Sequence, residues 1–176
     1  FEDLVDQKDH QKISLAELVG IPETERLRVN SVKFFIDGVL RSQTALLEQP
    51  YLMSESVHCG IQKIEEECLK KYVALLHSSN IQAHFHTIGN KAIRIALDAV
   101  EYAKENHPDL NPRHYLAHLQ LINNKDYQRF KDLEVCANFS PLWCWYDENI
   151  QRTDPYLEPE RRKVQYPIQN VLKTGA

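Results

Sequence analysis

Along this chain, short apolar segments alternate with longer segments in which apolar residues recur every three or four positions. A short run rich in β-branched and aromatic residues is typical of a strand, whereas the three-to-four spacing is typical of an amphipathic helix. The strand-like runs cover residues 32–38, 81–86, 114–119 and 135–139. This alternation predicts an α/β fold.

Helical spacing fills the intervals between the predicted strands. Between Gly60 and Ser79, apolar residues gather on one side and charged residues on the other, as expected for a surface helix with one buried face. Further helices are expected from about Ile93 to His107 and from about Asn124 to Asp132, and a last helix is expected to carry Ile168, Val171 and Leu172. A loop containing Pro141, Pro155 and Pro159 is expected before this last helix. Gly175 stands where a glycine that ends the last helix would stand.

A short helix is also predicted near the start of the chain. Ser14 and Glu17 form a capping box, and Gly20 and Pro22 would end the helix.

Strand, helix and strand in close succession imply parallel pairing through right-handed crossovers, so the strands should form one sheet with helices outside it. Two architectures satisfy this pattern. One is a small open doubly wound domain, and the other is part of an eight-stranded (β/α)8 barrel, which usually needs about 250 residues. In either case residues 1–176 are predicted to form a single domain.

Composition and charge exclude several classes of protein. With 43% hydrophobic and 26% charged residues, the chain should fold as a globule. The 21 basic and 25 acidic residues give a net charge of −4 without a dense basic block, so nucleic acid is not an expected partner. No apolar run approaches the roughly 20 residues that a membrane-spanning helix needs. No secretory signal is recognised, and a cytoplasmic location is expected.

The four cysteines form neither a CxxC pair nor the dense framework of a small secreted domain. Cys59, Cys68, Cys136 and Cys144 are therefore expected to be buried, reduced thiols.

Polar residues occupy the ends of the predicted strands, where parallel α/β sheets carry their ligand sites. His86 and His118 stand at such ends on consecutive strands. Because neutral imidazole nitrogen binds zinc and similar ions, they form a candidate metal-binding pair. The alternative is that each is a hydrogen-bonded core residue. His84 lies deeper in the strand of His86, and for His84 the core role is favoured.

Lys33 lies inside an apolar strand, where an ammonium group is costly to bury unless its charge is paired or removed. One interpretation is an edge lysine or one that is ion-paired with Asp37, which lies on the same face of that strand. The other interpretation is a lysine that binds metal after chemical modification.

Three motifs follow one another in this part of the chain. VKFFIDGVLRSQTALLEQPY at 32–51, QAHFHTIGNKAIRIALDAVE at 82–101 and RHYLAHLQ at 113–120 resemble the V-K-x-F-x-D-G, H-x-I-G-D-x-A and R-x-x-I-E-H-x-Q segments of the YtcJ-like metal-dependent amidohydrolases. ANFSPLW at 137–143 is a weaker fourth match. Asn90 replaces the usual acid after the glycine, and Gln43 replaces an arginine often found in the turn, which bears on substrate preference.

The resemblance implies that the chain is a central piece of a (β/α)8 barrel, covering about strands four to seven. It implies that a divalent metal, expected to be zinc, is held by Lys33 in carboxylated form, by His86 and by His118, and that these three residues are the catalytic ones. Ligands from the family's first and eighth strands have no counterpart that can be placed in this sequence.

The implied reaction is hydrolysis of the C–N bond of a small, non-peptide amide. Trp143, in the loop after the fourth strand, and Asp37 are expected to border the substrate pocket. Because a fold can lose its chemistry, a non-catalytic regulatory or binding protein is the alternative. A four-stranded piece with open edges is also expected to self-associate.

Overall fold

The computed structural model describes residues 28–176 together with Glu17, Val19, Gly20, Thr24 and Arg26. The helix predicted to begin at Ser14 lies largely outside the described residues.

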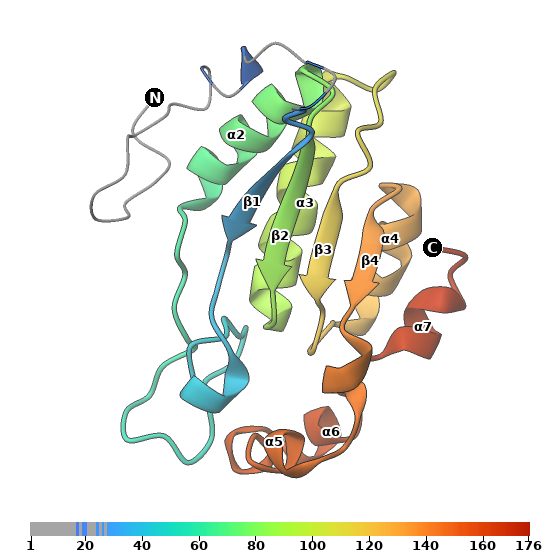
Figure 1. The fold of residues 1–176 in the computed structure, drawn as a ribbon. Coiled ribbons are helices and arrows are strands. Elements are labelled where there is room, and N and C mark those ends of the chain that lie inside the picture. Colours follow the sequence, from blue (N-terminus) through green and yellow to red (C-terminus); the bar gives the residue numbers. More distant parts are fainter. Residues whose placement is uncertain (1–16, 18, 21–23, 25, 27) are drawn as a thin grey trace.

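Four parallel strands form the sheet, in the order β1-β2-β3-β4 (Figure 1). They are β1 (Ser31–Phe35), β2 (Gln82–Thr87), β3 (Tyr115–His118) and β4 (Cys136–Phe139). Each predicted strand is present within a few residues of its expected bounds, and the predicted parallel pairing is confirmed. All four strands therefore end at the same edge of the sheet.

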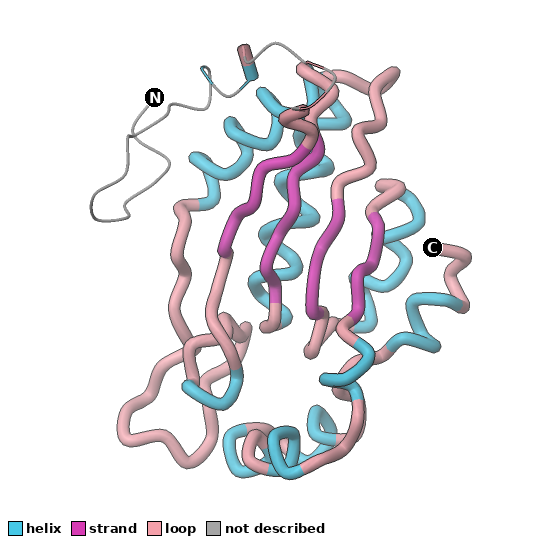
Figure 2. The backbone as a smooth tube through the Cα atoms, in the orientation of Figure 1, coloured by secondary structure: helices cyan, strands magenta, loops and turns pink. Residues whose placement is uncertain are grey.

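The longest helices lie between consecutive strands and cover one face of the sheet (Figure 2). They are α2 (Glu66–Ser78), α3 (Asn90–Asn106) and α4 (Tyr127–Asp132), and α7 (Ile168–Leu172) follows near the end of the chain. Apolar residues of α2 and α3, such as Val73 and Ile93, form one core cluster with Phe34 of β1 and Phe85 of β2. This arrangement leaves the alternate strand positions pointing to the opposite face.

That opposite face, called here the helix-free face, carries Lys33, Phe35 and His84. Phe35 is 53% exposed although it belongs to the apolar run that predicts the first strand. In the described part of the chain β1 and β4 each pair on one side only. The sheet is thus open at both edges.

The segment 140–167 is not a plain loop, and the expectation that it would be one is wrong. It contains the short helices η3 (Pro141–Cys144), α5 (Glu148–Gln151), η4 (Asp154–Tyr156) and α6 (Pro159–Arg162). The side chain of Asp147 accepts hydrogen bonds from the N–H groups of Asn149 and Ile150 and so caps α5. Figure 1 shows this segment below the C-terminal ends of the strands, together with η1 (Leu40–Ser42).

The four cysteines all lie in the part of the chain that the structure describes, and none of them forms a disulfide bond, as expected. Their expected burial is wrong, because Cys68 is exposed on α2 and the other three are only partly buried. Among the described residues, no helix has the length and apolar character needed to cross a membrane.

Candidate active site

Lys33 points from β1 onto the helix-free face. Its Nζ lies 2.7 Å from Nε2 of His84, the residue paired with it on β2. Burial lowers the pKa of Lys33. The structure thus places the lysine against an imidazole, while the carboxylate of Asp37 takes its hydrogen bonds from other groups, described below.

His84 is not a core residue, so the role favoured from sequence is wrong. The side chain is partly exposed and lies between Lys33 and Tyr115, whose hydroxyl is 2.7 Å from Nδ1 of His84. Because an ammonium group can only donate, Nε2 accepts from Lys33 and Nδ1 carries the proton that is shared with Tyr115. Burial, and next the charge of Lys33, lowers the pKa of His84 to about 4, so this imidazole is neutral at pH 7.

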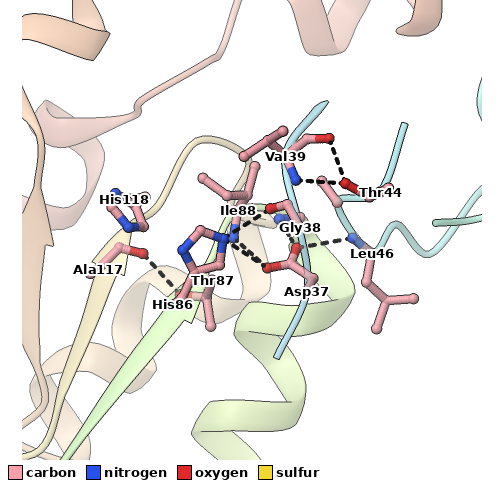
Figure 3. A network of polar contacts seen from close by, with 12 residues as sticks. Asp37, Gly38, Val39, Thr44, Leu46, His86, Thr87, Ile88, Ala117 and His118 are labelled. Carbon is pink, nitrogen blue, oxygen red and sulfur yellow. Dashed lines mark hydrogen bonds and ion pairs between the residues drawn. The ribbon is translucent and has the colours of Figure 1, made fainter. Parts of the chain in front are cut away.

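His86 stands two residues further along β2, near its C-terminal end. Its Nε2–H donates to the carbonyl oxygen of Gly38 at 3.0 Å, and the same nitrogen is 3.9 Å from Asp37 Oδ1 (Figure 3). Burial is the main reason why its pKa is lowered. Because a neutral His86 donates through Nε2, its Nδ1 carries the lone pair that could bind a metal ion.

His118 ends β3 in an unusual backbone conformation. Alternation along the strand would place His118 on the side of Leu116, which is fully buried in the core under the helices. Its φ of 80°, followed by 55° at Leu119, lies in the left-handed region that non-glycine residues rarely adopt. This turn carries the ring to His86, with the two ring centroids 4.7 Å apart. Such strain is common at functional sites.

Two side chains of the following segment hold the His118 ring. Ser140 Oγ lies 3.2 Å from Nδ1, and the indole of Trp143 stacks on the ring with centroids 4.7 Å apart and planes 11° from parallel. Burial, then His86 and Lys33, lowers the pKa of His118 to about 4. His118 is therefore neutral at pH 7, and its Nε2 faces away from the Ser140 contact.

Asp37 is completely buried next to this pair. Its carboxylate accepts hydrogen bonds from the backbone N–H groups of Leu46, Ile88 and Gly89, at 2.9, 3.1 and 2.8 Å (Figure 3). Burial raises its pKa to about 7, although these three N–H groups oppose the shift. The side chain thus fastens the loops after β1 and β2 to each other, and its place in substrate binding stays a prediction.

Of the predicted metal ligands, the structure brings His86 and His118 together at the C-terminal edge of the sheet, while Lys33 lies in the middle of β1 and contacts His84. His86 and His118 are in ring contact, and Lys33 lies close enough to lower the pKa of both. Trp143 is in contact with His118.

The donor set fits a divalent metal in its chemistry, because two neutral imidazoles side by side are the form in which histidine binds such ions. It is only part of a metal cage: within the described residues, no group of three or more His, Cys, Asp or Glu side chains converges. A carboxylated Lys33 would add an oxygen donor.

Sequence reasoning missed Tyr115 and Ser140, which hold His84 and His118. Tyr115 carried a weak signal, since it alternates with the core residue Leu116 and so shares the helix-free face. Ser140 carried none, because its contact depends on the backbone turn at His118.

Several known proteins are similar to this chain in sequence or in fold. The profile described as "Amidohydrolase family" matches residues 3–176. YtcJ of Bacillus subtilis (strain 168), whose name places it among amidohydrolases, is 30% identical over 112 residues, which is 63% of this chain and 20% of YtcJ. The exoenzymes regulatory protein AepA of Pectobacterium carotovorum subsp. carotovorum is 28% identical over 146 residues, 80% of this chain and 30% of AepA.

Among solved structures, an uncharacterized metal-dependent hydrolase from Pyrococcus horikoshii OT3 superposes with a TM-score of 0.74 at 28% identity, covering 91% of this chain and 32% of that one. The predicted fold class is confirmed: the strand–helix units are part of the fold of such hydrolases. The chain spans at most about a third of the length of these three relatives.

Proposed function

This chain belongs to the amidohydrolase family, and on that premise we propose that it carries part of the active site of a metal-dependent hydrolase that cleaves the C–N bond of small, non-peptide amides. The observation that carries the proposal is the ring contact of His86 and His118 at the C-terminal ends of adjacent parallel strands. Each imidazole is neutral at pH 7, and each retains a free ring nitrogen.

A divalent ion such as Zn²⁺, when bound, supplies a Lewis acid that polarises the amide carbonyl and lowers the pKa of water. The chain's own residues do the rest. His86 and His118 bind the ion through neutral nitrogens, the carbonyl of Gly38 fixes the orientation of the His86 ring, and Ser140 with Trp143 fixes that of His118. Trp143 also covers one face of the His118 ring.

We assign Lys33 the role of an additional ligand after carboxylation. Its lowered pKa raises the fraction of free amine, which forms an N–C bond with carbon dioxide and releases a proton. The His84–Tyr115 pair holds the lysine in place. ¹³C NMR of the chain equilibrated with ¹³C-labelled bicarbonate should show a carbamate signal that Lys33→Ala lacks.

Metal binding by the 176-residue chain tests the site directly. Calorimetric titration with Zn²⁺ should give binding that His86→Ala and His118→Ala each weaken at least tenfold. His107→Ala, an exposed histidine at the end of α3, is the matched control and should leave the affinity unchanged. Equal affinity in all three variants would remove His86 and His118 from the site.

Activity is expected only in a longer protein that contains the remaining ligands. This chain alone should hydrolyse no N-acyl or N-formyl amine, whereas the longer protein should do so, lose activity to a chelator and regain it with Zn²⁺. A longer protein in which His86→Ala keeps full activity would contradict the assignment.

A second candidate function is regulatory binding without catalysis. It is favoured by the name of AepA, a regulatory protein, and by the incomplete metal cage in the described part of the chain. A longer protein that binds metal and stays inert across a broad amide panel would support it.

A further inference from the structure

A cavity of about 270 Å³ lies beside the candidate active site, beyond the C-terminal ends of β1, β2 and β3. Its walls come from η1, from the residues after β2 and β3, and from the η3–α5 segment. Most lining side chains are apolar or aromatic, among them Leu40, Ile88, Leu142, Trp143, Ile150 and Tyr166.

Trp143 joins the cavity to the candidate site. One face of its indole stacks on His118, and the residue also lines the cavity. A substrate whose reacting bond lies at His86 and His118 therefore extends past Trp143 into the cavity.

Four polar side chains of the lining are already engaged with the protein, whereas the exposed guanidinium of Arg41 and the hydroxyl of Tyr166 have no hydrogen-bond partner among the described residues. Gln120 donates to Gln165 at 2.7 Å, Thr153 donates to the carbonyl of Ile150 at 2.7 Å, and Asn149 donates to Asp147 at 3.1 Å. Asp147 also accepts from two backbone N–H groups. The cavity thus offers few free hydrogen-bonding groups to a ligand.

The charges of the lining are balanced. Arg41 is the one cation and Asp147 the one carboxylate among the lining residues, so their formal charges cancel. An uncharged ligand group is therefore favoured over an anion or a cation.

The volume sets the size of the ligand group. Cavities that hold a whole drug-sized ligand measure about 300–1,000 Å³, and a cavity of about 150 Å³ already holds benzene. A space of 270 Å³ therefore fits one substituted ring and not a complete larger ligand.

We propose that this cavity binds an uncharged aromatic substituent of the substrate, so that the hydrolase acts on neutral aryl amides. The inference rests on the proposed function, because it places the amide bond at His86 and His118. Trp143 offers the ring an aromatic surface, and pairs of stacked or edge-to-face rings gain stability beyond the area that they bury.

The chain contains two tryptophans, which provide a matched pair of variants. Trp145→Ala leaves Trp143 as the sole indole, and Trp143→Ala removes the cavity wall. Trp145 is 76% exposed and does not line the cavity, so its loss should leave binding intact. Acetanilide serves as the neutral aryl probe, N-cyclohexylacetamide as its saturated counterpart and 4-acetamidobenzoate as its anionic counterpart.

Saturation-transfer NMR on the chain should show acetanilide bound in the wild type and in Trp145→Ala, with at least tenfold weaker affinity in Trp143→Ala. Titration of Trp145→Ala with acetanilide should also change the fluorescence of Trp143 in a saturable way. The cyclohexyl and benzoate probes should bind several-fold more weakly. Leu142→Glu provides a second variant, since Leu142 is 88% exposed and a charge there should weaken binding without disturbing the fold.

Equal affinity of the two tryptophan variants for acetanilide, or a preference for 4-acetamidobenzoate, would overturn the inference. The proposed function can fail separately. A longer protein that hydrolyses amides without preferring aryl substrates would support the proposed function and contradict the inference. Probe binding as expected, in a longer protein without metal-dependent hydrolysis, would support the aromatic binding site and contradict the proposed function.

Discussion

Asp37 illustrates how one buried side chain can hold together the loops that border a site. Its carboxylate is fully buried and accepts hydrogen bonds from three backbone N–H groups of the surrounding loops. A buried N–H group that loses its partner costs about 1–3 kcal/mol. The stability of the folded loops around the site therefore depends on this carboxylate.

Replacing Asp37 by alanine should lower the free energy of unfolding by about 3 to 5 kcal/mol, because three buried N–H groups lose their acceptor. Urea denaturation at pH 5, below the pKa of about 7, measures this while the wild-type side chain is protonated, so that removal of a buried charge does not offset the loss. Asp109→Ala, at an exposed site, should change the value by no more than about 0.5 kcal/mol. A loss below about 1 kcal/mol for Asp37→Ala would show that the loops do not depend on it.

A second buried group lies at the other end of the strands, away from the site. His77 and His114 are joined by a contact of 3.0 Å between Nδ1 and Nε2. His114 Nδ1 accepts from the backbone N–H of Ala83, and His77 Nε2 donates to the carbonyl of His107. These end partners require His114 to carry its proton on Nε2 and His77 on its own Nε2, so both rings are neutral.

This chain of hydrogen bonds predicts a loss of stability in acid. Burial, then the neighbouring His77, lowers the pKa of His114 from 6.5 to about 3. Below pH 6.5 the unfolded chain therefore binds a proton that the folded chain does not, and His114 alone should lower the free energy of unfolding by up to about 1.4 kcal/mol per pH unit. His84 and His118, whose pKa is lowered to about 4, add contributions of the same sign. Urea denaturation between pH 7.5 and 5 measures the slope.

His114→Gln serves as the comparison, because the raised pKa of Asp37 makes a contribution of opposite sign between about pH 4 and 7. In this variant the contribution of His114 to the pH dependence of the free energy of unfolding should be absent, whatever the overall stability of the variant. NMR of the wild type gives a second measurement: a His114 ring that titrates near pH 6.5 would contradict the neutral pair.

At the scale of elements, the site depends on how closely the loop after β1 approaches the start of α3. The carbonyl of Leu46 accepts from the N–H groups of Lys91 and Ala92, so the loop caps the helix. This approach requires glycine at position 89, since a Cβ there would stand 2.0 Å from the Leu46 oxygen. Gly89, the glycine of the H-x-I-G segment, is therefore needed because a larger residue would collide with the backbone of Leu46.

Gly89→Ala should therefore destabilise the protein by more than about 3 kcal/mol, because backbone must move on both sides of the contact. Gly175→Ala is the matched control: its φ of +83° makes alanine strained, but the nearest neighbour is the flexible Lys131 at 3.4 Å, so the cost should be about 1 kcal/mol. Thermal unfolding of both variants measures the difference. Equal losses of stability would show that the backbone at Leu46 moves away from a Cβ at position 89 at little cost.

In the molecule as a whole, the described residues leave the sheet with two unpaired edges and a helix-free face. Parallel sheets are commonly covered on both faces, and open strand edges favour association with other chains. We therefore expect the 176-residue chain to self-associate, with the exposed ring of Phe35 among the surfaces buried.

Light scattering at micromolar concentration should give a mass above the 20.6 kDa of one chain. Phe35→Ser should shift the equilibrium towards the monomer, because it removes the exposed ring from the helix-free face. Tyr102→Ser, at a 42% exposed ring on α3, is the control and should leave the mass unchanged. A wild-type chain that stays monomeric up to millimolar concentration would contradict this expectation.

The four strands, the main helices and their parallel order could be predicted from the sequence, because hydrophobic periodicity is a local property of each segment. The sequence also predicts His86 and His118 at one edge of the sheet, since parallel strands end on the same side, and there the two rings are in contact.

Only the tertiary structure decided which groups meet. The left-handed turn at His118 reverses the face that strand alternation assigns to it, and the register of β1 with β2 sets Lys33 against His84. The short helices after β4 form the cavity wall from residues that show no periodic pattern. These contacts join positions far apart in the chain, and their geometry depends on backbone turns and register that no single segment encodes.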